Sequence, residues 1–160
     1  MKKTTLFREI VTKKRGTVFP VAHDALTALL IERLGFEVMG VGGFGVSAAS
    51  YGYLDMGYIA LQEMVDATKR ICSIVSTPAL VDADTGYGGP IEVAKTVRLL
   101  EDAGAGALFI EDQQWPKRCG HINGKEVIPT VEMQEKIRAA VSARKDPDMM
   151  IMARTDAIAT

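Results

Sequence analysis

The fold of this chain is decided by the stretch Leu80-Val81-Asp82-Ala83-Asp84-Thr85-Gly86-Tyr87-Gly88-Gly89-Pro90. It begins as a short apolar run typical of a buried strand, delivers two carboxylates in alternation, and breaks on glycines before a helical pattern starts. Because Asp82 and Asp84 are two residues apart, their side chains leave the same face of an extended backbone. Two close carboxylates repel each other unless a cation or a proton lies between them, and such oxygen ligands suit a hard cation such as Mg²⁺. The alternative is a polar turn whose aspartates cap the next helix.

Length and composition favour one globular domain over residues 1–160. Of the 160 residues 48% are hydrophobic, which is enough for a sizeable core. The formal net charge of −1 gives no electrostatic reason to expect nucleic acid or an anionic membrane as partner. No apolar run approaches membrane-spanning length, and charged residues interrupt the N-terminal stretch where a signal peptide needs an apolar core. The two cysteines make no metal-type spacing, so a reduced cytoplasm is the expected compartment.

Five strand-like runs alternate with amphipathic helical stretches. A glycine-rich segment without a predicted helix leads from the second strand to Gly57, and a long polar loop covers Gln113–Pro129. Strands are predicted over Thr17–Ala22, Val38–Gly43, Ala79–Ala83, Ala107–Asp112 and Met149–Ala153, and helices over Thr5–Lys13, Ala25–Leu34, Leu61–Cys72, Pro90–Ala103 and Val131–Lys145.

Continuous apolar strands that are each followed by a helix indicate parallel βαβ units buried on both faces, and therefore an α/β fold. Two architectures fit this pattern. One is an open doubly wound sheet, and the other is a partial (β/α)₈ barrel of the TIM type, of which about five of the eight units would be present. In both, ligands bind at the carboxyl ends of the strands, which is where the polar and glycine-rich residues of this chain gather.

The polar loop after the fourth strand contains Lys117-Arg118-Cys119-Gly120-His121. A thiol between two cations and a histidine is expected to lose its proton more easily than a free thiol, which makes Cys119 a candidate acid, base or nucleophile. The alternative is a surface cysteine in a basic loop. Cys72 lies in a helical apolar pattern and is expected to be a small core residue.

Further polar residues follow the other strands. Glu111 and Asp112 end the fourth strand, where they either contact a metal or substrate or form salt bridges within the loop. Arg154 follows the fifth strand, where its guanidinium is suited to clamp a substrate carboxylate. His23 and Asp24, after the first strand, are expected to cap the next helix.

Two nucleotide motifs are disfavoured. The glycines after the third strand are not followed by Gly-Lys-Ser/Thr, so a nucleotide P-loop is not expected. The run Gly42-Gly43-Phe44-Gly45 is not followed by the predicted helix that a dinucleotide fingerprint needs.

Four motifs in order and spacing closely resemble the isocitrate lyase and phosphoenolpyruvate mutase superfamily, and most of all its methylisocitrate lyase and 2,3-dimethylmalate lyase branch. The resemblance runs from about Thr17 to the last residue. The motifs are Val81-Asp82-Ala83-Asp84-Thr85-Gly86-Tyr87-Gly88, Ile110-Glu111-Asp112-Gln113, Lys117-Arg118-Cys119-Gly120-His121 and Ile151-Met152-Ala153-Arg154-Thr155-Asp156.

The resemblance implies a (β/α)₈ barrel, a Mg²⁺ ion (with Mn²⁺ as a substitute), a homotetramer, and chemistry on enolate-like intermediates of small 2-keto acids. It also implies roles for individual residues. Cys119 matches the residue that gives a proton to the departing carbanion, and Arg154 the one that binds the substrate carboxylate. The implied metal ligands are Asp82, Asp84 and Glu111; the catalytic residues are Cys119, Lys117, Arg118, His121 and Asp55; the substrate-binding residues are Gly42, Gly43, Phe44, Gly120 and Arg154.

The cysteine selects among the activities of this superfamily. The lyases carry the Lys-Arg/Lys-Cys-Gly-His loop, whereas the phosphonomutases and oxaloacetate decarboxylases lack its cysteine. We therefore expect a Mg²⁺-dependent carbon–carbon lyase that cleaves a small di- or tricarboxylate of the 2-methylisocitrate or 2,3-dimethylmalate type to pyruvate plus a carboxylate. The alternatives are a phosphonomutase, an oxaloacetate decarboxylase, or an inactive truncated barrel, because the barrel of the superfamily continues past the position of Thr160. Gly42 stands where these lyases usually have a serine, and Phe44 is expected to narrow the pocket.

Overall fold

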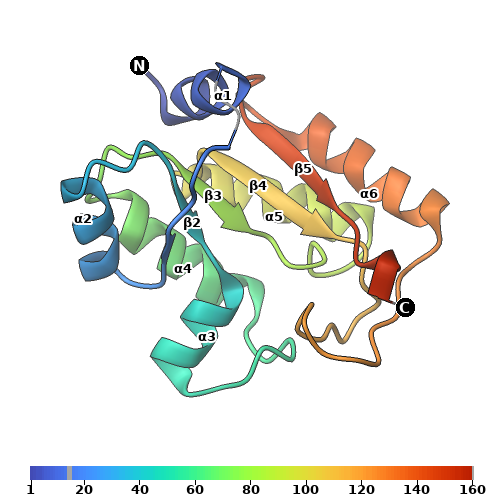
Figure 1. Cartoon of the computed structure of the whole chain (residues 1–160). Coiled ribbons are helices and arrows are strands. Elements are labelled where there is room, and N and C mark those ends of the chain that lie inside the picture. Colours follow the sequence, from blue (N-terminus) through green and yellow to red (C-terminus); the bar gives the residue numbers. More distant parts are fainter. Residues whose placement is uncertain (14–15, 160) are drawn as a thin grey trace.

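Five parallel strands form one sheet in the order β1-β2-β3-β4-β5, in a computed structural model that describes residues 1–13 and 16–159 (Figure 1). A doubly wound sheet reverses its strand order at a switch point, and this sheet does not. The order is that of consecutive units in a (β/α)₈ barrel, so the partial TIM-type barrel is confirmed and the doubly wound sheet is not. The strands are β1 (Val21–Ala22), β2 (Met39–Val41), β3 (Ala79–Asp82), β4 (Ala107–Glu111) and β5 (Met150–Arg154).

Helices follow the strands in alternation, and helix α1 precedes them at the end of the sheet opposite to the arrowheads (Figure 1). None of the helices in the described residues is long and apolar enough to cross a membrane. The helices are α1 (Lys3–Lys13), α2 (Ala25–Arg33), α3 (Gly43–Tyr51), α4 (Leu61–Cys72), α5 (Pro90–Asp102) and α6 (Thr130–Ala143), with a 3₁₀ turn, η1, over Ala157–Ala159.

Local signals explain where two of these helices begin. The Asp24 carboxylate accepts a hydrogen bond from the Thr27 N–H at 2.7 Å, so the predicted cap of α2 is confirmed for Asp24. The N-cap residue is Asp24 and not His23, whose Nε2 atom lies 3.6 Å from the Asp24 carboxylate. Helix α5 starts at Pro90, whose missing N–H costs nothing at a first helical position.

The prediction of a segment without a helix after β2 is wrong, because Gly43–Tyr51 forms helix α3. Glycine, serine and alanine dominate this helix, so its intrinsic helical signal is weak. The helix ends at Gly52, which has a φ of 68°, and Val46 buries its side chain in the core. The run Gly42-Gly43-Phe44-Gly45 is thus followed by a helix, so the argument made above against a dinucleotide fingerprint does not hold. The first strand is also shorter than predicted, since within Thr17–Ala22 only Val21 and Ala22 pair with β2.

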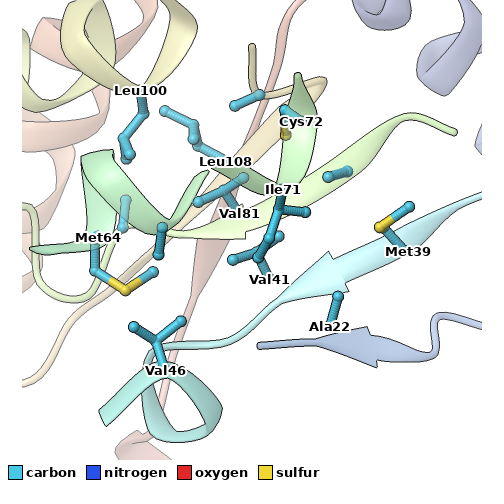
Figure 2. Packing of buried hydrophobic residues seen from close by; sticks show 14 of the residues in the cluster. Ala22, Met39, Val41, Val46, Met64, Ile71, Cys72, Val81, Leu100 and Leu108 are labelled. Carbon is cyan, nitrogen blue, oxygen red and sulfur yellow. The ribbon is translucent and has the colours of Figure 1, made fainter. Parts of the chain in front are cut away.

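The main hydrophobic core lies between the sheet and the helices that follow its strands. In Figure 2, Met64, Ile71 and Leu100 from helices α4 and α5 gather around strand residues such as Val81 and Leu108. Each fully buried side chain of this kind stabilises the fold by about 1.5–3 kcal/mol. Cys72 belongs to this core, as predicted.

The opposite face of the sheet is the inner face of the barrel. Toward the amino ends of the strands it is apolar, where Phe7 of α1 packs with Val38 and Ala107 in a second, smaller cluster. Because side chains alternate along a strand, the residues two and four places after an inward-facing strand residue such as Ala107 also point inward. At the carboxyl ends of β3, β4 and β5, those inward residues are charged.

Candidate active site

Three neighbouring strands bring charged residues to the inner face at their carboxyl ends. Asp82 pairs in register with Phe109, and Glu111 pairs with Arg154. The guanidinium of Arg154 also lies 5.9 Å from the centre of the Phe109 ring, a cation–π distance. The alternation of side chains along parallel strands therefore places Asp82, Glu111 and Arg154 on one surface.

The turn after β3 is held in an uncommon conformation by the carboxylates of Asp82 and Asp84. Asp82 accepts hydrogen bonds from the N–H groups of Gly43 at 3.0 Å and of Asp84 at 2.8 Å. Asp84 has a φ of 54°, in the left-handed region that few non-glycine residues adopt, and its carboxylate accepts from the Thr85 N–H at 2.8 Å. The two aspartates therefore bond to the turn itself and to the start of α3. At the start of the next helix, α5, it is Glu92 that accepts the Gly89 N–H, at 2.9 Å.

Lys117 reaches from the long loop into this group of acids. Its ammonium lies 2.8 Å from Asp55 and 3.5 Å from Asp84, and only 4% of the lysine side chain is exposed. The neighbouring carboxylates raise the pKa of Lys117 above its usual range in spite of its burial, so the lysine is charged. Lys117 therefore ties the loop to the Asp84 turn.

Arg154 is oriented by two acids. Its guanidinium lies 2.7 Å from Glu111 and 3.2 Å from Asp156. Burial is the largest single influence on the pKa of Arg154 and lowers it. The neighbouring carboxylates act in the opposite direction, and the net effect is a raised pKa. The Asp156 backbone is itself fixed, because its N–H donates to the Asp112 carboxylate at 2.9 Å. Salt bridging, the alternative weighed for Glu111, is what the structure has at this position.

Cys119 lies at the tip of the loop, partly buried, with its Sγ atom 3.6 Å from Nδ1 of His121. The tip passes close over Arg154, since a Cβ atom built on Gly120 would collide with Nη2 of the arginine. A larger residue at position 120 would therefore require the Arg154 guanidinium to move. The ammonium of Lys125 donates to the carbonyls of Gly120 at 3.0 Å and of Ile122 at 2.7 Å, which closes the tip on itself.

Two carboxyl groups of the site have raised pKa values, because they are buried. Burial is the main cause for Asp84, whose pKa rises to about 6, and for Glu111, whose pKa rises to about 7. Lys117 opposes both rises and Asp82 adds to them. Within residues 1–13 and 16–159, no three His, Cys, Asp or Glu side chains converge closely enough to form a metal site by themselves.

The remaining candidates lie at the margin of this group. Gly42 and Gly43 form the start of α3, and a Cβ atom on Gly43 would come within 3.1 Å of the Asp82 carboxylate. The side chain of Phe44 is 56% exposed. Arg118 is exposed and its guanidinium lies next to Gly124.

Sequence reasoning missed two buried polar side chains that hold the site together. Gln113 has 1% of its surface exposed and links the loop to the acids. Lys136, on α6, donates to the carbonyl of Thr85 at 3.1 Å, next to Asp84. The only signal for Gln113 was its place in the Ile110–Gln113 motif, and Lys136 gave none.

Comparison with known proteins identifies the family. The family model described as phosphoenolpyruvate phosphomutase matches residues 7–160. A 2,3-dimethylmalate lyase from Eubacterium barkeri is 44% identical over 160 residues, which are 100% of this chain and 55% of that protein. A 2-methylisocitrate lyase from Shewanella oneidensis is 41% identical over 153 residues, 96% of this chain and 52% of that protein. The chain thus spans about half the length of these curated relatives.

Solved structures agree with this result. A 2,3-dimethylmalate lyase, named as a member of the PEP mutase/isocitrate lyase superfamily, matches with a TM-score of 0.90 and 37% identity over 100% of this chain and 55% of its own. A structure of oxaloacetate acetylhydrolase in complex with 3,3-difluorooxalacetate matches with a TM-score of 0.94 and 34% sequence identity. The match covers 99% of this chain and 55% of that chain. A structure of phosphonopyruvate hydrolase in complex with oxalate and Mg²⁺ matches with a TM-score of 0.89 and 34% sequence identity. The match covers 98% of this chain and 53% of that chain. The chain belongs to the PEP mutase/isocitrate lyase superfamily, as its motifs suggested. Because these neighbours have different names, fold similarity does not select the substrate.

Proposed function

We propose that the protein containing this chain is a Mg²⁺-dependent carbon–carbon lyase, which cleaves a 2-methylisocitrate or 2,3-dimethylmalate type substrate to pyruvate and a second carboxylate. The observation that carries the proposal is Cys119. Its loop is tied by Lys117 to the buried acids and passes directly over Arg154 at Gly120. The two relatives named above as lyases also favour this activity.

The acids fit a hard divalent cation. Asp82, Asp84 and Glu111 offer oxygen ligands, and the carboxylates outnumber the cations that contact them. Mg²⁺ commonly takes only one or two carboxylates and keeps several waters, so a cluster of three protein ligands is not needed. Oxygen ligands of this kind also suit Mn²⁺. A neighbouring structure, phosphonopyruvate hydrolase, is named with oxalate and Mg²⁺.

In this proposal Asp82 and Asp84 would hold the metal directly or through water, with Glu111 in support. A bound Mg²⁺ supplies electrostatic stabilisation to the oxygen of the 2-keto acid. Arg154, already oriented by Glu111 and Asp156, binds a substrate carboxylate through its guanidinium.

The proton transfers complete the reaction. The substrate hydroxyl gives its proton to one of the site's carboxylates as the keto group forms, the carbon–carbon bond breaks, and the electron pair of that bond stays on the departing fragment. Cys119 then gives the Sγ proton to that carbon. Two further residues lie beside the thiol loop in this proposal. His121 has its Nδ1 atom 3.6 Å from the Cys119 Sγ atom, and Asp55 binds Lys117.

Replacing Cys119 tests this role. General acid catalysis contributes about 10²–10⁴-fold, so Cys119→Ala in the full-length protein should lower kcat for pyruvate release by at least about 100-fold. Cys72→Ala is the matched control, because this second thiol is buried in the core behind the sheet and far from the proposed chemistry. Unchanged turnover in Cys119→Ala would remove Cys119 from the mechanism.

A second candidate function is a reaction on oxaloacetate or on a phosphonate. The neighbours named oxaloacetate acetylhydrolase and phosphonopyruvate hydrolase favour it. Turnover of oxaloacetate or phosphonopyruvate, without cleavage of either malate-type substrate, would support this alternative.

Location in the cytoplasm and assembly into a homo-oligomer, a tetramer in the superfamily, belong to the same proposal. Both rest on the resemblance to the lyase branch. Light scattering of the full-length protein tests the tetramer, and a monomer across micromolar concentrations would contradict it.

A further inference from the structure

Gln113 follows directly after Asp112 at the end of β4, and the reaction proposed above gives it no role. Its buried amide has three partners. Nε2 donates to Asp156 at 2.5 Å and to Glu111 at 3.2 Å, and Oε1 accepts from the Arg118 N–H at 3.0 Å. Because ionised carboxylates only accept and a backbone N–H only donates, these partners fix which side of the amide faces which group.

The stem of the loop does not depend on this side chain. Backbone bonds hold the stem, since Gln113 forms an antiparallel bridge with Val127 and the Ile128 N–H donates to the Asp112 carbonyl at 2.8 Å. Removing the side-chain amide should therefore leave the stem paired.

The tip, residues 117–125, depends on side chains instead. Lys117 and Lys125 each hold one part of it, as described above. The Gln113 amide holds the Lys117–Arg118 peptide unit, one residue before Cys119, since it accepts the N–H of Arg118. Its contact lies one residue before Cys119, as the contact of Lys125 with the Gly120 carbonyl lies one residue after it.

We propose that Gln113 is a positioning residue for Cys119. One amide binds the tip through Arg118 N–H and binds the two acids, Glu111 and Asp156, that orient Arg154. It thereby sets the distance between the thiol and the arginine. The inference rests on the proposed function only in that Cys119 acts as the proton donor; the anchoring of the tip can be measured without turnover.

The first test compares Gln113→Met with Gln114→Met in the full-length protein. Methionine keeps the length of the side chain and removes all three hydrogen bonds, whereas Gln114 is an exposed neighbour. Peptide mass spectrometry follows the alkylation of Cys119 by iodoacetamide. Gln113→Met should react about fivefold faster than wild type, the factor expected when one ordinary hydrogen bond no longer holds the tip. Gln114→Met should react at the wild-type rate.

Steady-state kinetics on the lyase substrate gives the second readout. A misplaced proton donor should lower kcat of Gln113→Met about 100-fold with little change in KM. A lower melting temperature with unchanged alkylation and unchanged kcat would show a merely structural role and overturn the inference. A raised KM with unchanged alkylation would also overturn it, because Gln113 would then act through Arg154 alone.

The outcomes separate this inference from the proposed function. Faster alkylation of Cys119 in Gln113→Met, together with a wild-type protein that cleaves neither substrate, would refute the lyase and support the anchor. If Gln113→Met does not fold, hydrogen exchange of the wild-type protein decides. The Arg118 amide should exchange more slowly than expected for its exposed residue, and exchange at the rate of an unprotected amide would overturn the anchor.

Discussion

The contact of Lys117 with Asp55 and Asp84 makes a quantitative prediction about stability. Lys117→Met in the metal-free full-length protein removes the cation and keeps most of the side-chain volume. The pair is buried, with 4% of the lysine and 6% of the Asp84 side chain exposed. Removing one partner of a buried ion pair costs about 3–5 kcal/mol of unfolding free energy, because the remaining charge loses its compensation.

The loss should depend on pH in a defined direction. The folded-state pKa of Asp84 is raised by burial from 3.8 to about 6, and Lys117 holds it down. Without Lys117 this pKa rises further. A carboxyl whose folded-state pKa is above its unfolded value destabilises the fold as pH rises above the unfolded value, because the unfolded chain then ionises more readily. The variant should therefore lose more stability at pH 8 than at pH 5, where Asp84 is protonated.

Urea unfolding at pH 5 and pH 8, with EDTA present, measures both effects. Lys145→Met is the matched control, since Lys145 pairs with Asp102 on the surface with both side chains 58% exposed. A surface pair of this kind contributes at most about 1 kcal/mol. The reasoning would be refuted by a loss in Lys117→Met no larger than in Lys145→Met, or by equal losses at both pH values.

Two further predictions concern the frame of the site. Gly43→Ala should weaken Mg²⁺ binding measured by calorimetry, because the added Cβ would lie 3.1 Å from the Asp82 carboxylate that the Gly43 N–H holds. Gly89→Ala is its control, with a contact of 3.5 Å to Glu92, and equal affinities in the two variants would count against the role of Gly43. Asp24→Ala should lower the unfolding free energy by about 1 kcal/mol in urea titrations, because α2 loses its cap. No change in that variant would mean that solvent replaces the cap at no cost.

Much of the barrel was predictable from local signals. The third strand and its helix agree with prediction to within one residue, because the apolar run, Pro90 and Gly104 mark their limits. The order of the strands was not predictable from periodicity, which fits both parallel architectures, and only the motifs favoured the barrel.

Helix α3 and the interior contacts were beyond sequence reasoning for physical reasons. Gly43–Tyr51 is rich in small residues with weak helical preference, and its packing against the core decides its conformation. Gln113 meets Asp156, 43 residues away in the chain, and Lys136 meets Thr85, 51 residues away. A pattern read along the sequence does not reveal such pairs. The treatment of residues 1–160 as one domain, and the site roles carried by the resemblance, stay predictions.

The measurement that tests the central claim most directly is pyruvate release by the full-length protein from 2-methylisocitrate and from 2,3-dimethylmalate, in Mg²⁺ and after EDTA. Oxaloacetate and phosphonopyruvate are assayed in parallel. We predict that at least one of the two malate-type substrates yields pyruvate in Mg²⁺, that EDTA abolishes the release, and that added Mg²⁺ restores it. Release of pyruvate that is insensitive to EDTA, or cleavage of neither substrate, would contradict a Mg²⁺-dependent carbon–carbon lyase.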